Sequence, residues 1–552
     1  MEYIDYALYF IGFALALFAW ICILKYNMHM FQLNGYKNDE WRRWLSKNSA
    51  TQRLLYAAII PLAFSHFIIV ARILAAIISL ILIINYISFE KGATKKKLVY
   101  TARVKRLIVT MVLLLVIINA LMFFVVPRVL TWYQPRRFES LAVITLLLAA
   151  FVPEMLILAN IINHPMEQGI NNHYINDAKR ILGQNPDLTV IGITGSYGKT
   201  SVKYYLHTLL SDFFNVIMTP ESFNTPMGVV KTIRGSMQPS HEIFICEMGA
   251  RHVGDIKEIC DIVHPKHGIL TSIGPQHLET FFNMENIIST KYELSDALPS
   301  DGILFVNADN ENITGELDRR IKSGAGLPGE VIRYSGTSDT AGSSAEAGSY
   351  KVSGYTTCDV SVSPSGTEFT VTAPDGESER FATRLIGEHN VINIVGAIAV
   401  ANRLGVPLKK LRVPVRRIQS VPHRLEMKHH GQVTIIDDAY NSNPVGSKAA
   451  VETLAMFDGV RILVTPGMVE LGDKEEEYNK AFGGYAAACC DHILLVGKER
   501  TKPIAEGARE AGFPEERLMA FDTLEEALAQ AYRADGAGHR YILLENDLPD
   551  QY

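Results

Sequence analysis

The sequence lacks the features that define several classes of protein. Its 552 residues include only six cysteines, and no two of them stand at a Cys-x-x-Cys spacing. This usage excludes a disulfide scaffold and a zinc-ribbon site, and it indicates reduced thiols that face the cytosol. The formal net charge is -5, so the chain has no excess of positive charge that would attract nucleic acid. We therefore expect no nucleic-acid partner.

The N-terminal part is rich in apolar residues, but we expect no cleavable signal peptide there. Residues 1–5 are acidic where a signal peptide is basic, and no small-residue cleavage site follows. Crossing a bilayer takes about 20 residues. Four apolar runs reach or exceed this scale: 4–22, 54–89, 107–126 and 141–162. The second run is too long for one crossing and has polar residues, His66 and Arg72, near its middle, so it predicts a hairpin. Residues 1–165 are thus expected to form an α-helical membrane domain of about five helices, with four as the alternative.

Basic residues predict the orientation of this domain. Lysines and arginines are dense in the loops that follow the first two runs and sparse in the loop after residue 126. By the positive-inside rule, the two dense loops face the cytoplasm. We therefore expect a multi-pass protein of the plasma membrane, with everything after His164 in the cytoplasm, where ATP is. Glu154, in the last run, is either a functional intramembrane acid or a contact to a neighbouring helix.

Downstream of residue 165 the pattern changes to that of an α/β protein. Apolar residues at helical spacing predict a juxtamembrane helical linker over residues 166–187. Short apolar runs separated by helix-length segments predict a central ATP-binding domain, 188–415, with a parallel sheet covered on both faces. Within it, residues 350–382 alternate like a small antiparallel β segment. A second alternating unit predicts a Rossmann-like C-terminal domain, 416–552.

The strongest local motif joins the first strand and the first helix of the central domain. A β-branched run leads into Gly-Ile-Thr-Gly-Ser-Tyr-Gly-Lys-Thr-Ser over residues 192–201. Its glycines let backbone N–H groups surround an anion, Lys199 places a positive charge against the outer phosphates, and Thr200 or Ser201 offers a hydroxyl to Mg²⁺. Ile193 stands where the strict phosphate-loop pattern has its first glycine. The alternative is a glycine-rich turn without a ligand, but the flanking strand and helix favour a nucleotide.

Three further residues in this domain carry chemistry. Glu247 closes an apolar strand, a position from which a carboxylate reaches Mg²⁺ on bound phosphates. His277 follows another strand end, and Lys291 comes fourteen residues later. Taken singly, a histidine such as His277 is more often a loop histidine, and a lysine such as Lys291 is more often a solvated helix lysine.

These residues belong to an ordered series of motifs. The series runs from residue 188 to 497 and comprises the phosphate loop, Glu247-Met248-Gly249, His277 with Lys291, Gly387-Glu388-His389-Asn390 with Asn393, Arg424, and Asp437-Asp438-Ala439-Tyr440-Asn441-Ser442-Asn443-Pro444. In this order the motifs resemble the Mur ligase family, and within it the MurF type, whose C-terminal signature is similar to residues 466–472.

The resemblance implies how ATP and Mg²⁺ are held. Lys199 and the loop amides would hold the β- and γ-phosphates. Thr200 and Glu247 would hold one Mg²⁺, and His277 would hold a second. Lys291 would be carbamylated by CO₂, which turns a cation into a carboxylate-like ligand of that second ion.

The resemblance also implies contacts to the rest of the nucleotide. Asn390 and Asn393 would contact the adenine, while Arg424 and Asp438 would reach the phosphates and ribose from the C-terminal domain when the domains close. The implied catalytic residues are Lys199, Lys291, His277 and Arg424. The implied nucleotide-binding residues are Thr194, Gly195, Ser196, Gly198, Lys199, Thr200, Ser201, Asn390, Asn393, Arg424 and Asp438.

The reaction implied by the resemblance is ADP-forming synthesis of an amide bond. A carboxylate of a peptide or muramoyl-peptide precursor attacks the γ-phosphate, and the amine of an amino acid or dipeptide traps the acyl phosphate. The chain departs from the MurF type in two places. The membrane domain replaces the soluble N-terminal domain that grips the UDP-sugar, and residues 544–549 replace a Lys-Gly-Ser-Arg run. The amine acceptor and the carboxylate substrate, UDP-linked or membrane-linked, therefore stay open.

Two other functions are compatible with parts of the sequence. One is a nucleotide-driven transporter, but no helix start resembling Leu-Ser-Gly-Gly-Gln is present. The other is a non-catalytic ATP-binding scaffold at the membrane. The joint presence of the charged residues of the motifs disfavours it: Lys199, Glu247, His277, Lys291 and Arg424.

Overall fold

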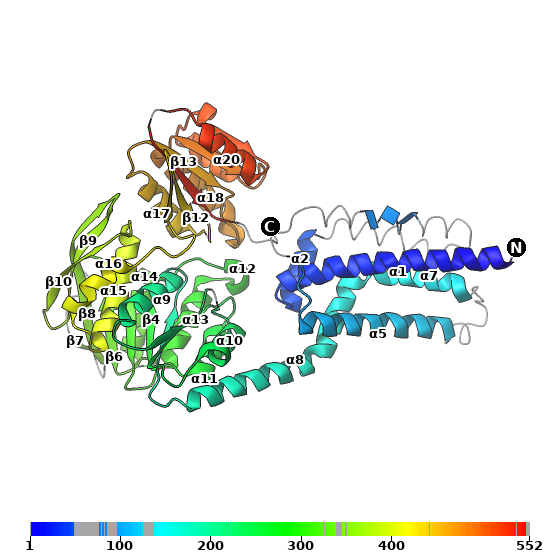
Figure 1. Cartoon of the computed structure of the whole chain (residues 1–552), viewed down its shortest axis with the longest axis horizontal. Coiled ribbons are helices and arrows are strands. Elements are labelled where there is room, and N and C mark those ends of the chain that lie inside the picture. Colours follow the sequence, from blue (N-terminus) through cyan, green and yellow to red (C-terminus); the bar gives the residue numbers. More distant parts are fainter. Residues whose placement is uncertain are drawn as a thin grey trace. The chain divides into compact units, whose positions relative to one another are not determined.

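The chain divides into two compact units, Met1–Asn172 together with Pro549–Tyr552, and His173–Leu548 (Figure 1). The boundary between them falls inside the predicted linker. This computed structural model describes residues 2–48, 77–78, 80–81, 83–84, 97–124, 137–221, 223–324, 326–337, 345–347, 350–440, 442–536 and 538–547. All six cysteines lie within these ranges and are free thiols, as their spacing predicts.

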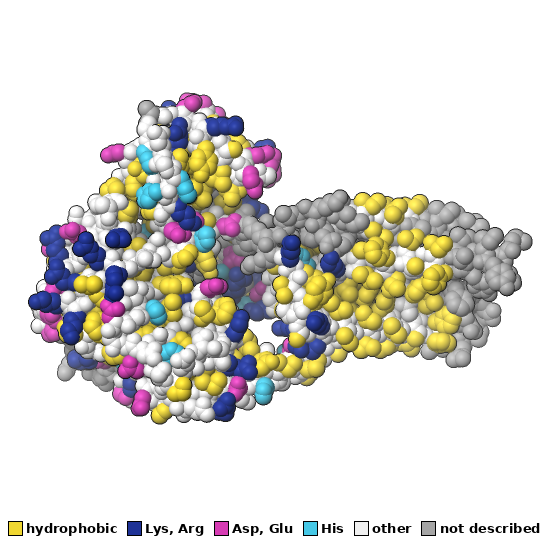
Figure 2. Space-filling model, viewed as in Figure 1, with side chains coloured by type: hydrophobic (Ala, Val, Ile, Leu, Met, Phe, Trp, Pro, Cys, Tyr) yellow, Lys and Arg dark blue, Asp and Glu magenta, His cyan; other side chains and the backbone are white. Residues whose placement is uncertain are grey.

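The described part of the first unit is helical. Its helices are α1 (Glu2–Leu33), α2 (Asn38–Asn48), α5 (Ala102–Phe124), α7 (Arg137–Ala150) and the first part of α8 (Val152–Gly183). A buried cluster that includes Trp20, Phe31 and Trp41 holds them together, and the Trp41 indole N–H donates to the Pro153 carbonyl over 3.1 Å. Figure 2 shows hydrophobic side chains over much of the visible surface of these helices. Exposed apolar residues of α5 include Leu113 and Val116.

Two described helical segments, Phe10–Leu33 and Ala102–Phe124, are long and apolar enough to cross a membrane. The pair Ile144–Ala150 and Val152–Gly183 makes a third only if it counts as one span, because it is bent by 78°. The structure thus differs from the single membrane crossing expected over residues 141–162. Helix α8, which contains most of the predicted linker, begins inside this apolar run and continues beyond it. Pro153, at the second position of α8, has no backbone N–H to donate and favours the first turn of a new helix. The hairpin expected over 54–89 lies almost wholly outside the described residues.

A sheet of ten described strands forms the centre of the second unit. Its path is β10-β9-β8-β6-β5-β4-β1-β3-β2, with β7 paired to β8. The strands are β1 (Thr189–Thr194), β2 (Val216–Met218), β3 (Ile243–Glu247), β4 (His267–Leu270), β5 (Ile303–Asn307), β6 (Glu330–Tyr334), β7 (Ala345–Ala347), β8 (Tyr350–Ser363), β9 (Gly366–Thr372) and β10 (Ser378–Thr383).

The antiparallel segment expected over 350–382 is part of this large sheet. Strand β8 is 14 residues long, so its first half pairs in parallel with β6 and its second half pairs antiparallel with β9. The parallel core and the antiparallel extension are therefore continuous. Periodicity alone does not reveal this, because it gives the facing of a strand and not its neighbour.

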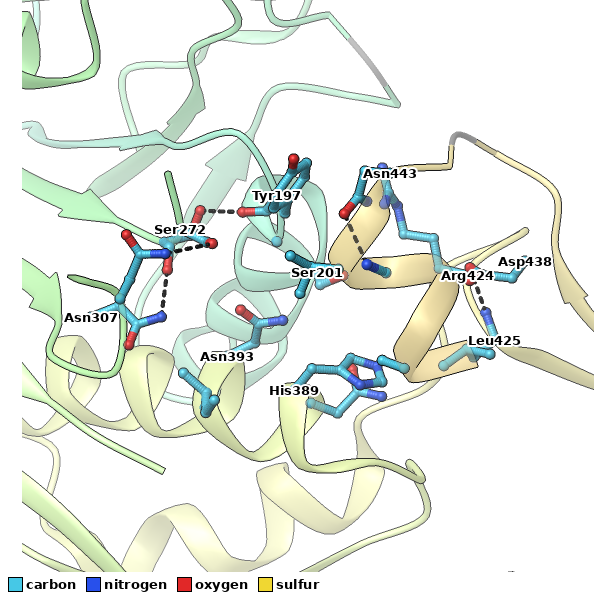
Figure 3. Close-up of a pocket in the computed structure, with 18 of the residues that line it drawn as sticks. Tyr197, Ser201, Ser272, Asn307, His389, Asn393, Arg424, Leu425, Asp438 and Asn443 are labelled. Atoms are coloured by element: carbon cyan, nitrogen blue, oxygen red, sulfur yellow. Dashed lines mark hydrogen bonds between the residues drawn. The ribbon is translucent and has the colours of Figure 1, made fainter. Parts of the chain in front are cut away.

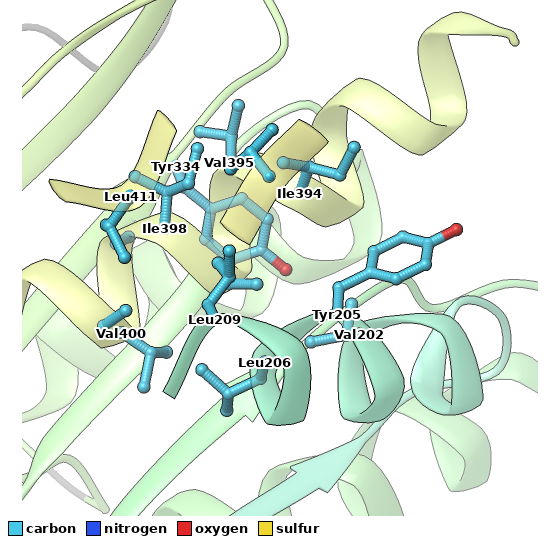
Figure 4. Packing of buried hydrophobic residues seen from close by; sticks show 14 of the residues in the cluster. Val202, Tyr205, Leu206, Leu209, Tyr334, Ile394, Val395, Ile398, Val400 and Leu411 are labelled. Atoms are coloured by element: carbon cyan, nitrogen blue, oxygen red, sulfur yellow. The ribbon is translucent and has the colours of Figure 1, made fainter. Parts of the chain in front are cut away.

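Helices cover both faces of the parallel core, as the sequence predicts. One face carries α9 (Lys199–Leu210), α15 (Glu388–Arg403) and α16 (Leu408–Arg417). The other carries α10 (Pro226–Ser236), α11 (Asp255–Val263), α13 (Met284–Asp296) and α14 (Glu311–Ser323). Val202 and Leu206 of α9 pack in one buried cluster with Ile394 and Ile398 of α15 (Figure 4). This packing fixes the start of α9, where the phosphate loop ends, relative to the start of α15.

The C-terminal part of the second unit forms a separate sheet of six described strands in the order β11-β12-β16-β13-β14-β15. All neighbours are parallel except β11 and β12. The strands are β11 (Glu426–His430), β12 (Val433–Asp438), β13 (Val460–Thr465), β14 (His492–Val496), β15 (Leu518–Phe521) and β16 (Arg540–Glu545). Helices α17 (Pro444–Leu454), α18 (Glu475–Cys489), α19 (Lys502–Glu510) and α20 (Leu524–Arg533) accompany them. Because β16 lies between β12 and β13, the carboxyl ends of these three strands are adjacent.

Candidate nucleotide-binding and ligase site

The loop between β1 and α9 has the tight backbone of a phosphate loop. Gly195 and Gly198 have φ values of +154° and +80°. A Cβ atom on Gly195 would lie 2.2 Å from the Thr271 hydroxyl oxygen, and one on Gly198 would lie 2.7 Å from the Asn393 amide oxygen. Only glycine satisfies both the backbone conformation and the space at these two positions.

The side chains of the loop fall into two groups. Lys199 Nζ donates to the carbonyls of Gly195 and Ser196 over 2.6 and 2.9 Å, and burial lowers its pKa to about 8. The Thr194 hydroxyl donates to the Met248 carbonyl and the Ser196 hydroxyl to the Gly274 carbonyl, each over 2.9 Å. Any contact that Thr194 or Ser196 makes with a nucleotide would therefore come through the backbone, whereas Lys199 is the cation poised at the loop.

Glu247 is fully buried behind the loop. The Thr200 hydroxyl and the Asn224 amide each donate to Glu247 Oε1 over 3.1 Å, and Lys203 Nζ lies 3.0 Å from Oε2. Burial by itself raises the pKa of Glu247, but Lys203 and Lys199 together hold it below its usual range. Glu247 is thus an ionised carboxylate. The sequence prediction did not include Lys203, although its spacing of four residues from Lys199 places both on one face of α9.

These groups fit a divalent cation. The Thr200 hydroxyl and the Glu247 carboxylate are adjacent oxygen donors of the kind that Mg²⁺ prefers. Lys291, on α13, is buried, and burial together with the charge of Lys199 sets its pKa well below the ordinary value. A lysine amine must be neutral to add CO₂, so the surroundings of Lys291 also suit the carbamate implied by the family resemblance.

His277 adopts the left-handed conformation, with φ +54°, just before the short helix α12 (Leu278–Phe281). Its Nδ1 lies 2.5 Å from Oε2 of Glu470, which comes from the loop after β13. Burial lowers the pKa of His277, while Glu470 opposes that shift. The sequence prediction did not assign a role to Glu470, because the Pro466–Gly472 signature identified its loop and not its partner.

A cavity of about 280 Å³ lies beside the loop (Figure 3). The structure brings six predicted nucleotide-binding residues to its wall: Gly198, Ser201, Asn390, Asn393, Arg424 and Asp438. The other eight predicted site residues are not among the described residues that line this cavity: Thr194, Gly195, Ser196, Lys199, Thr200, Glu247, His277 and Lys291. The geometry therefore gathers the residues expected around the nucleoside in one cavity and places the predicted metal-binding residues outside its wall.

Two residues at the start of α15, Asn390 and His389, line the cavity. Asn390 Oδ1 accepts from the Tyr205 hydroxyl over 2.7 Å, and Nδ2 donates to the Ile386 carbonyl over 2.9 Å. Because a carboxamide has two N–H donors and two acceptor lone pairs, these two bonds orient the side chain and leave capacity for a further contact to adenine. His389, which the sequence prediction did not include, also lines the cavity, and burial lowers its pKa to about 4. Its ring is therefore neutral at pH 7.

The cavity wall also carries a pair of acids, half-buried Asp438 and buried Glu545. They stand opposite one another in the register of β12 and β16. The Ser442 hydroxyl donates to Glu545 Oε1 over 2.5 Å, while Oε2 has no hydrogen-bond donor among the described residues. Burial raises the pKa of both acids, that of Glu545 far above its usual range, and Arg424 opposes the shift at Asp438. The pair therefore holds a proton. The sequence marked Glu545 only as part of the 544–549 departure.

Comparisons with known proteins agree with this geometry. The family model of the Mur ligase middle domain matches residues 193–401, and that of the Mur ligase, glutamate ligase domain matches residues 423–544. The UDP-N-acetylmuramoyl-tripeptide--D-alanyl-D-alanine ligase of Escherichia coli (strain K12) is 29% identical over 353 residues, which cover 62% of this chain and 73% of that protein.

Solved structures show the same fold. A crystal structure of MurF from Acinetobacter baumannii superposes with a TM-score of 0.59 and 25% identity, covering 69% of this chain and 78% of that one. MurF from Thermotoga maritima, solved in complex with ADP, superposes with a TM-score of 0.57 at 23% identity, covering 69% and 81%.

A phosphate-loop domain and a second sheet domain line one cavity. Together with these matches, they define the class as an ATP-dependent, ADP-forming amide ligase. The chain belongs to the Mur ligase family, and the similarity is to its MurF type. The resemblance inferred from the ordered motifs is thereby confirmed.

Proposed function

We propose that the chain joins D-alanyl-D-alanine, or a related dipeptide or amino acid, to the carboxylate of a muramoyl-tripeptide precursor of the cell wall. The observation that carries the proposal is the cavity that unites the phosphate loop, the start of α15 and the C-terminal strand ends. The activity for which the E. coli relative is named supplies the substrates.

ATP binding begins at the loop. Lys199 Nζ, which now donates to two loop carbonyls, turns to the β- and γ-phosphates, and the loop amides bind the same groups. Mg²⁺ supplies charge neutralisation at the transferring phosphoryl group when it is bound by Thr200 and Glu247. Asn393 and Asp438, from opposite walls of the cavity, orient the nucleoside.

The reaction has two steps that balance. The substrate carboxylate attacks the γ-phosphorus and ADP leaves, which gives an acyl phosphate. The acceptor amine then attacks the acyl carbon, inorganic phosphate leaves with the bonding electrons, and the amine loses a proton as the amide forms. Lys199 and Arg424 place positive charge where negative charge moves during the first step. Carbamylated Lys291 and His277 would hold a second Mg²⁺.

The direct test is product analysis with the full chain. ATP, UDP-muramoyl-tripeptide and D-alanyl-D-alanine are incubated with the protein, and products are identified by mass spectrometry. We expect the pentapeptide product together with one ADP per amide bond. ATP binding without any product from muramoyl-peptide substrates and amine acceptors would contradict the proposal and favour the non-catalytic scaffold.

We further propose that the first unit is a multi-pass domain of the plasma membrane and that the substrate is presented at the membrane, with the catalytic unit in the cytoplasm. The two helices long and apolar enough to span a bilayer support this, as do the basic loops that flank them. Reporter fusions after Lys97 and after Ile181 are expected to read cytoplasmic, and a fusion after Arg137 external. An external reading after Ile181 would separate the ligase from ATP and contradict the topology.

A truncation decides whether the membrane domain takes part in substrate recognition. A protein that starts near Gly169 keeps the His173–Leu548 unit with its own buried cores. We expect it to use UDP-muramoyl-tripeptide much more slowly than the full chain does. Equal rates would show that the substrate is the cytosolic UDP-linked peptide and that the helices serve only as an anchor.

A further inference from the structure

The contact between His277 and Glu470 joins the two sheet domains of the second unit. His277 follows β4 of the central sheet, and Glu470 follows β13 of the C-terminal sheet. Glu470 Oε2 lies 2.5 Å from His277 Nδ1, and its Oε1 lies 3.6 Å from an Arg251 guanidinium nitrogen. The same loop approaches α12 closely, because a Cβ atom on Gly472 would lie 3.8 Å from Leu278 Cβ. The C-terminal loop is thus docked on the segment that carries His277.

The backbone on both sides of this contact is unusual. His277 and Glu470 both adopt positive φ, +54° and +65°. For residues with a Cβ atom this conformation costs free energy, and it persists where the surrounding structure holds it. Because both residues of this contact adopt the costly conformation, we infer that the surrounding structure holds the contact in place and that it is not incidental.

The contact also fixes the chemical form of the imidazole. A carboxylate only accepts hydrogen bonds, so Nδ1 of His277 carries the hydrogen and donates to Glu470. In the neutral ring this leaves the lone pair on Nε2. A histidine that binds a metal is oriented in this way by a carboxylate on its other nitrogen, and removing the carboxylate weakens metal binding about 10- to 100-fold.

We propose that Glu470 is a positioning residue that presents His277 Nε2 to a divalent cation, so that cation binding and docking of the C-terminal loop favour one another. The proposal rests on the metal-binding role proposed for His277 above. It follows by linkage: if docking improves the cation site, the cation must stabilise docking by the same factor. A purely structural ion pair between the domains would not have this property.

The test uses Mn²⁺ with ADP as the probe of the full chain. Electron paramagnetic resonance counts bound Mn²⁺, and electron spin echo modulation detects nitrogen coordinated to it. We expect a nitrogen-coordinated Mn²⁺ in the wild type, its loss in His277→Ala, and a 10- to 100-fold weaker site in Glu470→Ala. Glu470→Gln, which keeps an acceptor oxygen without the charge, should fall between Glu470→Ala and the wild type. Glu476→Gln, on the exposed first turn of α18, is the control and should bind as the wild type does.

Hydrogen exchange gives a second readout that does not depend on turnover. Mn²⁺ with ADP should slow exchange of the amides of residues 468–472 in the wild type, and much less in Glu470→Ala, relative to ADP alone. Unchanged Mn²⁺ affinity and nitrogen coupling in Glu470→Ala would overturn the role of Glu470 while leaving that of His277 intact. Absence of nitrogen coordination in the wild type would overturn both, and normal ligase activity without it would leave the proposed function standing.

Discussion

The central and C-terminal sheets present the same architectural edge with different polar groups. In both, loops follow the carboxyl ends of parallel strands. The central edge contributes Lys199, which is half-buried, and the buried residue Lys291, whereas the C-terminal edge contributes an acid pair, half-buried Asp438 and buried Glu545. A triphosphate is attracted by the charge of Lys199, whereas the acid pair offers it no positive charge. The difference indicates that the central domain captures ATP and that the C-terminal domain selects and orients what has been captured.

The largest expected effect comes from removing the positive charge of Lys199. Lys199→Ala should lower the rate of ADP formation by about a thousandfold or more, because a preorganised charge at the transferring phosphoryl group is lost. Coupled ADP release measures this, and circular dichroism confirms that the fold is intact. Lys257→Ala, which removes an exposed lysine paired with Asp261, is the matched control. Undiminished turnover in Lys199→Ala would remove the phosphate-loop assignment.

The second effect concerns the buried amine of Lys291. Lys291→Ala should be at least about a hundredfold slower, since a charge-neutralising ligand of the second cation is absent. Formate or acetate should restore part of the activity, because a small carboxylate can occupy the space of the missing carbamate. Lys291→Glu should retain more activity than Lys291→Ala. Full activity of Lys291→Ala without added acid would show that no carbamate is needed.

The third effect concerns the positive charge of Arg424, which lies on the C-terminal domain's side of the cavity. The Arg424 guanidinium lies 4.7 Å from the centre of the Tyr440 ring and lines the cavity beside Asp438. Arg424→Ala should lower kcat/KM for ATP by about 10- to 100-fold. Arg424→Lys should recover only part of this loss, because an ammonium cannot form the planar, bidentate contacts of a guanidinium. Steady-state kinetics at varied ATP concentration measure kcat/KM for each protein. Equal kcat/KM values for the wild type, Arg424→Ala and Arg424→Lys would contradict the role of Arg424.

The smallest effect is on stability and tests the acid pair. The folded state raises the pKa of Glu545, so between the unfolded and folded pKa values the native protein binds more protons than the unfolded chain. Stability from this group is therefore present at low pH and is lost as the pH rises. Glu545→Gln removes the titration and lets an amide N–H donate to Asp438. Its melting temperature should exceed that of the wild type by a few degrees, about 2–4 °C per kcal/mol, and more so at pH 8 than at pH 5.

The control for this measurement is Glu452→Gln, an exposed acid on α17 that faces Lys448 at 3.7 Å. It should show no such dependence on pH. A difference between Glu545→Gln and the wild type that is constant from pH 5 to pH 8 would mean that the pair does not hold a proton.

The features that the sequence predicted lie within short segments, whereas the contacts that it missed join residues far apart in the chain. The phosphate loop and Glu247 could be placed from short motifs at strand ends, whereas the role of Lys291 was implied only by the family resemblance and stays a prediction. Glu470 and Glu545 were not, because their partners, His277 and Asp438, are 193 and 107 residues away. Those pairs depend on strand order and domain docking, which periodicity does not encode. The continuity of β8 with the parallel sheet was missed for the same reason.

Strand β16 has a consequence for how the protein is made. It is the last described strand in the chain, yet it lies in the interior of its sheet, paired with β12 on one side and β13 on the other. During synthesis, domains fold from the N-terminal end as they emerge. This sheet, however, cannot be completed until residues 540–545 have been synthesised and can pair between β12 and β13. Until then two strand edges stay unpaired, and the Asp438 carboxyl lacks its acidic partner Glu545. The nascent chain can therefore contain a folded phosphate loop while the ligase site is still incomplete and inactive. Loss of residues 540–545 should yield an aggregation-prone protein rather than a slower enzyme.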